Sequence, residues 1–316
     1  MKSRTQDGFA QVKLHADLAA TAGIVLMVVW GVNFVVTKVV LEAVGVAPFL
    51  FLRFLLMPLL GFALLVGVYR HHIAKSWPKR EDLPRFVAAG LIGHTAHVGI
   101  VMWGLNLSTP FSSSLVLCSS PLFTLFILAV LGAERLHARQ IAGTLLAFAG
   151  IVVFLSDKFA AGFALAGFGD LLLLFAASLF SLYTVIAKPL VTKYGPLNLM
   201  CYSLLFGAPP MLLITLPAFV YAPLEQVTAG VWFATFWAIA VSSFVGWIAW
   251  AWVNSVRGIA RSAPLQYMMP PIAGLVAWLT VGESFTWLKV VGAVVTMAGI
   301  AWAQFGWKSP TPPDAA

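Results

Sequence analysis

Charged residues are scarce in this sequence: they make up 9% of 316 residues, whereas hydrophobic residues make up 61% and the mean hydropathy is +0.94. A soluble domain is about 25% charged, so this shortage excludes a soluble globular protein and predicts a polytopic membrane protein. Cysteine is scarce as well. Cys118 and Cys201 both lie in apolar runs, which excludes a disulfide framework and a thiolate metal site.

Strand-like alternation and long polar segments are also missing. Only helices and closed barrels satisfy every backbone hydrogen bond in lipid, and uninterrupted apolar runs of about 20 residues exclude a barrel. The connections between the runs are too short to build an extramembrane domain. We therefore predict an all-α polytopic membrane protein with ten transmembrane helices. They are expected near residues 18–40, 48–68, 85–106, 111–132, 138–156, 167–188, 196–219, 229–253, 262–281 and 286–306.

The basic residues are distributed unevenly between the two ends of these spans. The polar segment 1–17 leads directly into the first span without a small-residue cleavage pattern, which predicts a retained helix. If this segment is cytoplasmic, 15 of the 19 Lys and Arg residues fall on the cytoplasmic side. The positive-inside rule then predicts that both termini are cytoplasmic and that the tail, 307–316, is a disordered cytoplasmic segment. The same asymmetry explains the net charge of +8, because the basic residues set the topology and contact anionic membrane lipid. A nucleic-acid partner is therefore not expected.

An internal repeat is visible in the sequence. Residues 121–151 align without a gap on residues 270–300, which lie 149 positions later. The alignment pairs Pro121 with Pro270, Glu134 with Glu283 and Gly143 with Gly292. The two units, 18–156 and 167–306, each contain five spans, and an odd number makes the second unit enter the membrane from the opposite side. Two inverted five-helix repeats are the architecture of alternating-access transporters.

Several short motifs resemble those of the EamA family of the drug/metabolite transporter superfamily. They are WGVNFVVTK, the run PFLFLRFLLMPLL with its Arg-Phe pair, and the GAE and VGE segments that each precede a glycine-spaced helix ending in AGI. The resemblance implies ten helices in two inverted repeats around a central cavity. It also implies a bacterial inner-membrane location and the export of small metabolites. The members that look most similar export cysteine-pathway metabolites or other amino acids.

Polar side chains within the spans are the candidate substrate contacts. In the first span, Trp30, Asn33 and Thr37 lie on one helical face; Asn33 either faces a cavity or bonds a neighbouring helix. In the eighth span, Ser243 and Trp247 share a face, and Trp247 is too central for the interfacial aromatic belt. We expect Trp247 to form a wall for a substrate side chain, with core packing as the alternative.

Three ionisable residues are also placed within spans. His94 and His97 are three residues apart on the third span and are expected to share a face as titratable or hydrogen-bonding cavity groups. A metal or haem site would need further ligands that the spans do not offer, so neither a metal nor a cofactor is expected. Arg53 is the one cation within a span. It either snorkels to the outer interface or binds a substrate carboxylate.

Irregular segments and the repeat supply further candidates. Prolines in the fourth and ninth spans free backbone carbonyls near mid-span, and those groups need a partner or a wet cavity. Tyr183 is the counterpart of Asn33, at an offset of 150. The additional candidates for substrate binding are Ser119, Tyr183, Tyr202, Gln266 and Tyr267.

Acidic residues are absent from the centres of the spans, which favours a facilitator over a proton-driven pump; otherwise the two histidines would carry the protons. We expect a monomeric or homodimeric exporter of a small molecule, most simply an amino acid or a similar metabolite. Two alternatives stay open. One is a broad-specificity exporter of drugs or hydrophobic solutes, and the other is a membrane-embedded haem or metal enzyme that uses His94 and His97.

Overall fold

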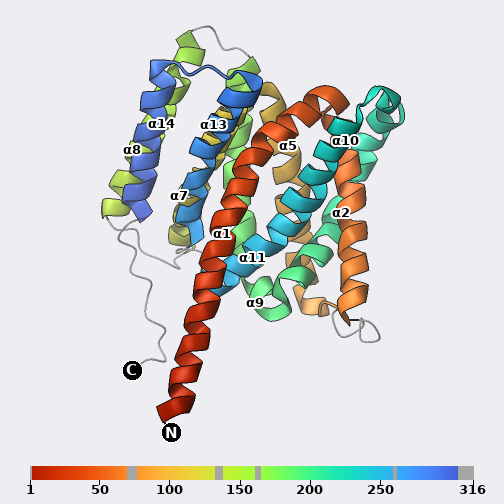
Figure 1. Ribbon diagram of the computed structural model, residues 1–316, viewed down its shortest axis with the longest axis vertical. Helices are drawn as coiled ribbons and strands as arrows, with labels where there is room; N and C mark the ends of the chain where they lie inside the picture. The colour runs from red at the N-terminus through yellow and green to blue at the C-terminus, as the bar shows by residue number, and fades with distance from the viewer. Residues whose placement is uncertain (1, 70–76, 132–137, 161–164, 259–261, 305–316) are drawn as a thin grey trace.

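The computed structural model describes residues 2–69, 77–131, 138–160, 165–258 and 262–304, and every regular element in these ranges is helical (Figure 1). Within these ranges, seven helical segments are long and apolar enough to cross a membrane, and two shorter apolar helices accompany them. The prediction of an all-α, multi-pass membrane protein is therefore confirmed. Glu134 and the tail that was predicted to be disordered lie outside the described residues.

The first half of the chain forms four helical segments and a fifth helix at one edge of the molecule. From Arg80 to Leu107 four elements follow one another without a gap and make one membrane-length segment. The elements are α1 (Lys2–Val44), α2 (Val46–Tyr69), η2 (Arg80–Asp82), α4 (Leu83–Ala88), η3 (Ala89–Ala96), α5 (His97–Leu107), α6 (Pro110–Leu117), α7 (Ser120–Val130) and α8 (Ala138–Ala160).

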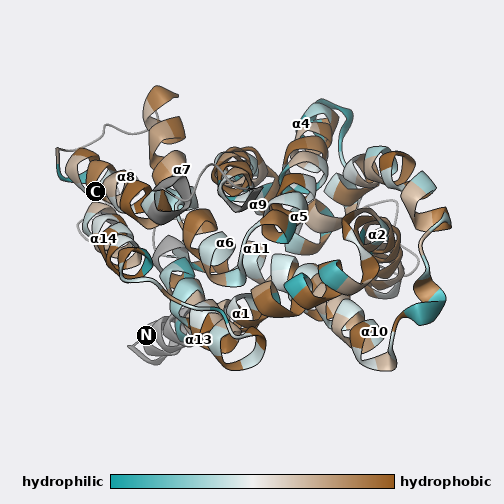
Figure 2. Ribbon diagram, turned by 90° about the horizontal axis from the view of Figure 1, so that it is seen from above, coloured by the Kyte–Doolittle hydropathy of each residue, from teal (hydrophilic) through white to brown (hydrophobic). Residues whose placement is uncertain are grey.

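The second half repeats this order in a modified form. Its elements are α9 (Leu165–Val220), η4 (Leu224–Gln226), α10 (Ala229–Phe236), η5 (Trp237–Val245), α11 (Gly246–Arg257), η6 (Ala263–Met268), α13 (Met269–Val281) and α14 (Trp287–Gln304). Seen from above, α8 and α14 lie at one edge of the molecule and α2 and α10 at the opposite edge, with α1, α5, α9 and α11 between them (Figure 2).

Two glycines in the left-handed region mark equivalent turns in the two halves. Gly45 separates α1 from α2 with φ +88°, and Gly195 lies within α9 with φ +80°. Side chains rarely adopt this conformation, so glycine suits both positions. Gly195 therefore divides the long α9 between the predicted sixth and seventh spans. At the start of the chain, helix α1 begins at Lys2, whereas the first span was predicted to begin near residue 18. Hydropathy detects only the part of a helix that lies in lipid, so the polar first turns of α1 were not predicted.

A π-helical segment interrupts the third helix of each half. The segments are η3 and η5, and each continues into regular α-helix on both sides. His94 in η3 and Ser243 in η5 lie 149 residues apart, the spacing of the sequence repeat. The sequence predicted regular helices here. π-Turns often lie at functional sites, so this shared irregularity directs attention to the side chains that follow each segment.

The fourth span is broken near its middle, as its proline predicted. Helix α6 ends at Leu117 and α7 begins at Ser120. The Ser119 hydroxyl donates to the Val116 carbonyl at 2.6 Å, and the Ser120 hydroxyl donates to the Leu117 carbonyl at 2.5 Å. Cys118 Sγ in the break donates to the carbonyl of Gln266 in η6, at 3.3 Å. The irregular segments of the two halves therefore meet inside the bundle.

Helices α8 and α14 run antiparallel and touch through small residues. A Cβ placed on Gly143 would lie 2.5 Å from the Ala303 nitrogen, and one on Gly150 would lie 2.3 Å from the Thr296 nitrogen. The contacts recur in exchanged form: a Cβ placed on the counterpart Gly292 would lie 2.4 Å from the Phe154 nitrogen, and one on Gly299 would lie 2.3 Å from the Ala147 nitrogen. Each glycine of α8 therefore makes the same kind of contact as the glycine 149 positions later in α14. This is the pattern of a local two-fold axis perpendicular to the helices.

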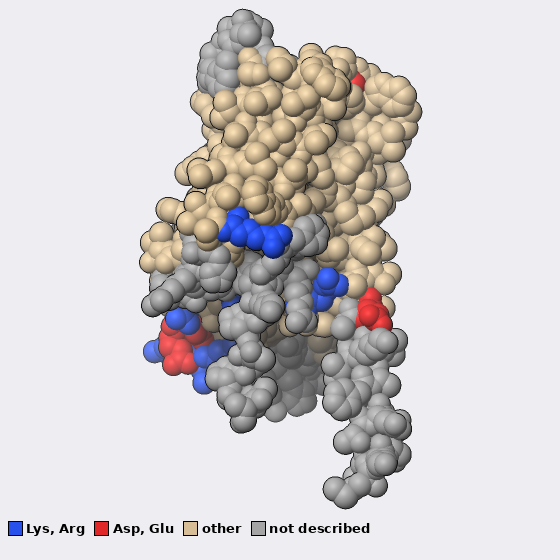
Figure 3. All heavy atoms as spheres, turned by 90° about the vertical axis from the view of Figure 1, so that its left-hand side faces the viewer, with Lys and Arg blue, Asp and Glu red and all other residues tan. Residues whose placement is uncertain are grey.

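Apolar side chains cover much of the outer surface. Leu213 and Ile214 on α9 are each 72% exposed, and Val130 at the end of α7 is 69% exposed. Figure 3 shows a broad band free of charged side chains, with most of the Lys, Arg, Asp and Glu side chains of this face below it and an acidic group near the upper edge. An exposed apolar surface of this extent suits contact with lipid tails.

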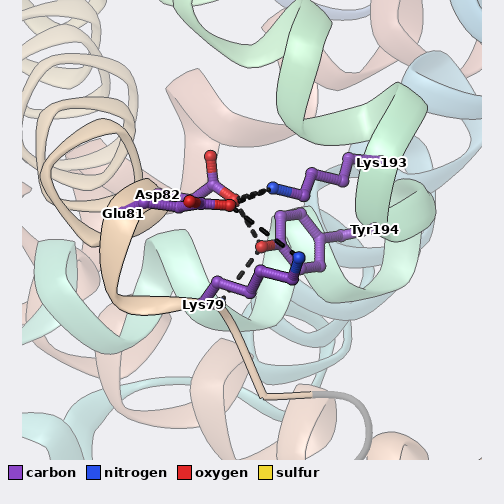
Figure 4. A network of polar contacts seen from close by, with 5 residues as sticks. All are labelled: Lys79, Glu81, Asp82, Lys193 and Tyr194. Atoms are coloured by element: carbon purple, nitrogen blue, oxygen red, sulfur yellow. Dashed lines mark hydrogen bonds and ion pairs between the residues drawn. The ribbon is translucent and has the colours of Figure 1, made fainter.

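A polar network joins the start of the third helical segment to the bend in α9 (Figure 4). Asp82 is buried, with 6% of its surface exposed, and its Oδ2 accepts hydrogen bonds at 2.5 Å from both Lys193 Nζ and the Tyr194 hydroxyl. Lys193 Nζ also lies 3.0 Å from Glu81 Oε1, and the Lys79 amide donates to the Tyr194 oxygen at 3.1 Å. These bonds fasten η2 beside the α9 bend.

Replacing Asp82 with asparagine is expected to lower Tm, because the change removes the buried negative charge from two charge-assisted bonds. Thermal unfolding of the purified protein in detergent would measure the loss. Lys79→Gln is the matched control: its ammonium lies 3.9 Å from Glu81 and both side chains are exposed, so Tm should stay near the wild-type value. Equal stability of Asp82→Asn and wild type would show that the network does not hold the bend.

Candidate functional site

A central cavity of about 130 Å³ lies among helices from both halves of the chain. Roughly 10–15 Å³ of such space holds one water molecule, so the cavity has room for several waters or a small solute. Among the predicted site residues, it is lined by Trp30, Asn33, Thr37, Arg53, His97, Ser243, Trp247 and Gln266.

The predicted face of α1 borders this cavity. Trp30 Nε1–H donates to the Ser242 carbonyl at 2.9 Å, which fixes the indole against η5. Asn33 Nδ2 donates to the Thr37 hydroxyl, one turn along the same helix, at 3.0 Å. Asn33 Oδ1 is buried and has no hydrogen-bond partner among the described residues. The Asn33 amide therefore bonds within its own helix and leaves an unused acceptor.

Arg53 reaches the cavity from α2 and is 6% exposed. It is the only residue with a fixed charge among the cavity-lining residues in the described part of the chain. The ion pairs formed there involve Lys38, Lys79 and Lys193, and none involves Arg53. The snorkelling alternative places the guanidinium at the outer interface, whereas this side chain is buried beside the cavity.

The two histidines occupy different surroundings, although both contact Trp247. His97 Nδ1–H donates to the Ala176 carbonyl at 2.9 Å, which leaves Nε2 as the acceptor of the neutral ring. The ring of His97 lines the cavity. His94 Nε2 lies 3.0 Å from the Ser203 hydroxyl, whose proton goes to a backbone carbonyl, so His94 donates. His94 lies within the π segment η3 and is not among the residues that line the cavity.

Trp247 separates the central cavity from a second cavity. The second cavity measures about 210 Å³, and Trp247 contributes to the lining of both. Its ring centroid lies 4.8 Å from His94, 5.3 Å from Tyr183 and 5.9 Å from Phe180. The lining of the second cavity includes the polar residues Lys188, Thr192, Asn254 and Ser255. An indole packed among these rings therefore forms a partition between the two spaces.

Five of the predicted site residues do not line the central cavity. His94 is one of them. Tyr183 lines the second cavity, where its ring contacts Trp247. Ser119 lies in the α6–α7 break, where its hydroxyl donates to a backbone carbonyl. Tyr202 packs against Trp77 and Phe86, and Tyr267 packs beside the cluster around Leu122.

Other cavity-lining residues were not among the candidates. Most are apolar, and they include Phe34 and Met102. Phe180 could have been found from the repeat, because it is the counterpart of Trp30 at the offset of 150 that pairs Asn33 with Tyr183. Ser120, the first residue of α7, lines the cavity, whereas its neighbour Ser119 in the preceding turn does not.

Metal-binding geometry does not occur in the ranges that the structure describes: no group of three or more His, Cys, Asp or Glu side chains is close enough to hold a metal ion. His94 and His97 are each hydrogen-bonded to other protein groups. The pair has no third ligand here, so the geometry offers no support for a haem or metal enzyme.

The sequence model of the EamA-like transporter family matches this chain twice, at residues 17–156 and at residues 167–304. The cavity takes side chains from both matched ranges. Asn33 and Arg53 belong to the first range, and Trp247 and Gln266 belong to the second. The two matched segments therefore enclose one shared space.

Two relatives match over nearly their whole length. The "Probable terminal-alkyne amino-acid exporter" of Streptantibioticus cattleyicolor is 28% identical over 89% of this chain and 92% of that protein. The "Probable amino-acid metabolite efflux pump" of Escherichia coli is 28% identical over 90% of this chain and 93% of that protein. A solved crystal structure with 20% identity superposes with a TM-score of 0.63, covering 91% of this chain and 97% of its own. The structural likeness shows the fold.

Proposed function

This chain belongs to the EamA-like transporter family, and we propose that it exports amino acids or related small metabolites across the bacterial inner membrane by alternating access. The observation that carries the proposal is the central cavity, which both family segments line. The two relatives described above carry the names of an amino-acid exporter and an amino-acid metabolite efflux pump. Their similarity over nearly the full length supports the same substrate class for this chain.

The alternating-access mechanism requires two packings of similar energy, which an inverted repeat provides. We propose ten transmembrane helices in two such repeats, with α9 counted as two helices that join at Gly195. The exchanged contacts of α8 and α14 support this arrangement. A local two-fold axis perpendicular to two membrane-crossing helices lies in the membrane plane. The equivalent π segments and the equivalent positive-φ glycines support the same relation.

The orientation that we propose places both termini in the cytoplasm. The clustering of basic residues at one end supports it, through the positive-inside rule. In this orientation Lys188 lies on the cytoplasmic side, so the second cavity, which Lys188 lines, would be the cytoplasmic vestibule. Trp247 lies between that vestibule and the central cavity. A substrate entering from the cytoplasm would have to pass this partition to reach the centre.

Counterflow in proteoliposomes tests the proposed function. Vesicles loaded with an unlabelled neutral amino acid should accumulate the labelled compound transiently above its equilibrium level, because an alternating-access carrier exchanges substrates across the membrane. Empty liposomes are the control. A labelled hydrophobic drug in a parallel set tests the broad-specificity alternative. Absence of exchange for every amino acid and related metabolite in the panel would overturn the proposal.

A further inference from the structure

We propose that the central cavity contains a subsite for the two charged groups of a neutral α-amino acid: Arg53 binds the carboxylate, and Asn33 Oδ1 accepts a hydrogen bond from the ammonium. This inference rests on the proposed transport function, because it assigns the substrate class to the same cavity. It is carried by two buried polar groups that lie at the cavity wall without protein partners of matching chemistry.

The carboxylate position follows from Arg53. A buried charge is costly unless a counter-ion and hydrogen bonds compensate it, and the described cavity lining contains no acidic residue that could serve. A guanidinium presents paired N–H donors that match the two oxygens of a carboxylate. A carboxylate-bearing solute therefore supplies the charge and the acceptors that the surrounding protein does not.

The ammonium position follows from Asn33. Its Nδ2 group is engaged by Thr37, so Oδ1 is the end of the amide that is left for a ligand. An ammonium has three donors and no acceptor, and it therefore matches a lone carbonyl oxygen. The neutral ring of His97, with Nδ1 bonded to Ala176, offers Nε2 as a second acceptor at the same cavity.

The remaining wall determines the side chain that the site would accept. Trp30, Phe34, Phe180 and Trp247 present aromatic surfaces to the cavity, and these suit an apolar side chain and the face of an ammonium. The described lining holds one fixed charge. A second carboxylate on the ligand would find no second cation, and a second ammonium would find no anion. The geometry therefore selects neutral amino acids over acidic and dibasic ones.

Equilibrium binding to the purified protein in detergent tests this subsite separately from transport. Trp30 and Trp247 line the cavity, so quenching or enhancement of intrinsic fluorescence reports on its occupancy. The probes are neutral amino acids of graded size, each with its carboxamide and its deaminated acid; leucine, leucinamide and 4-methylpentanoate form one such set. We expect the zwitterion to bind at least about 30-fold more tightly than the carboxamide, since one partner of a buried charged bond is lost.

Variants at Arg53 and Asn33 assign the carboxylate and the ammonium of the ligand to these two residues. Arg53→Gln should weaken zwitterion binding by about 30-fold or more and abolish the preference over the carboxamide. Arg53→Lys should restore part of that preference, because it keeps the charge without the fork. Asn33→Leu should abolish the preference for the zwitterion over the deaminated acid while the carboxylate requirement persists. Arg80→Gln is the matched control, because Arg80 is exposed and lies outside both cavities.

The outcomes separate this inference from the proposed function. Equal binding of zwitterion and carboxamide by the wild type overturns the subsite without requiring any variant to fold, even if counterflow succeeds. Failure of every zwitterion in the panel to bind also overturns it. If counterflow fails but the binding pattern and its dependence on Arg53 and Asn33 appear, the subsite stands and the transport proposal falls.

Discussion

Replacing Trp247 with alanine is expected to abolish counterflow and leave a leak of the same substrate. The indole lines both cavities and packs against His94, Phe180 and Tyr183. Its removal joins the two spaces, so the central cavity stays open toward the proposed cytoplasmic vestibule in every state. Exchange that depends on closing one side before the other opens would then fail. Downhill flux of labelled substrate should persist without saturation, whereas the transient accumulation should disappear.

The labelling rate of a cysteine introduced at Ser243 measures access to the central cavity past Trp247. Ser243 lines the central cavity, and the two native cysteines are buried, so background labelling should be low. A membrane-impermeant thiol reagent applied from the vestibule side should label Ser243→Cys slowly with Trp247 in place and rapidly with Trp247→Ala. Trp247→Phe, which keeps an aromatic ring at the partition, is the control and should stay slow. Equal labelling rates in all three backgrounds would contradict the role assigned to the indole.

The contact between α8 and α14 leads to the second large effect: Gly150→Ala and Gly299→Ala are expected to destabilise the protein by similar amounts. A Cβ at either glycine would lie 2.3 Å from a backbone nitrogen of the opposite helix. Backbone atoms cannot move aside as a flexible side chain can, so the helices must separate along their length. Overpacking of this kind costs about 1–3 kcal/mol, which thermal or denaturant unfolding in detergent would measure.

Gly67→Ala provides the matched control for these variants. Gly67 also lies within a membrane-length helix, but a Cβ there meets no atom within 4 Å. Alanine at such a helical position should leave stability unchanged or raise it slightly. Wild-type stability of both Gly150→Ala and Gly299→Ala would show that the close approach is not required. A large loss in one and none in the other would show that the exchanged contacts are unequal in energy.

Hydropathy was sufficient to predict the helical, membrane-spanning class, because about 20 apolar residues in sequence have few other solutions. The break before Pro121 was predictable as well, since proline cannot donate the hydrogen bond that a continuous helix needs. The π segments were not predictable. Nothing in the residues 89–96 or 237–245 distinguishes a π-turn from regular apolar helix, because the choice depends on packing between helices that are distant in sequence.

The candidate site shows the same limit. Residues on regular helix, such as Trp30, Asn33 and Thr37, line one cavity as helical periodicity predicted. Residues on irregular backbone follow it only in part. Ser243 in η5 and Gln266 in η6 line the cavity, whereas His94 in η3 does not, and Ser120 lines it in place of Ser119 in the preceding turn. Tyr183 was placed by its counterpart in the repeat, but Trp247 divides the space between the two residues. A bulky side chain from a third helix cannot be inferred from the spacing of two others.

The exchanged contacts of α8 and α14 bear on how such a chain could arise. Two identical half-length chains inserted in the membrane in opposite directions would make this contact with each other. In such a pair, every substitution would appear twice, once on each side of the interface. Fusion into one chain removes that restriction, so the two copies can diverge separately. The glycines at 150 and 299 are the same in both, whereas their partners are now Thr296 and Ala147. The two sides of the interface thus share one glycine spacing, whereas the residues that face the glycines differ in chemistry.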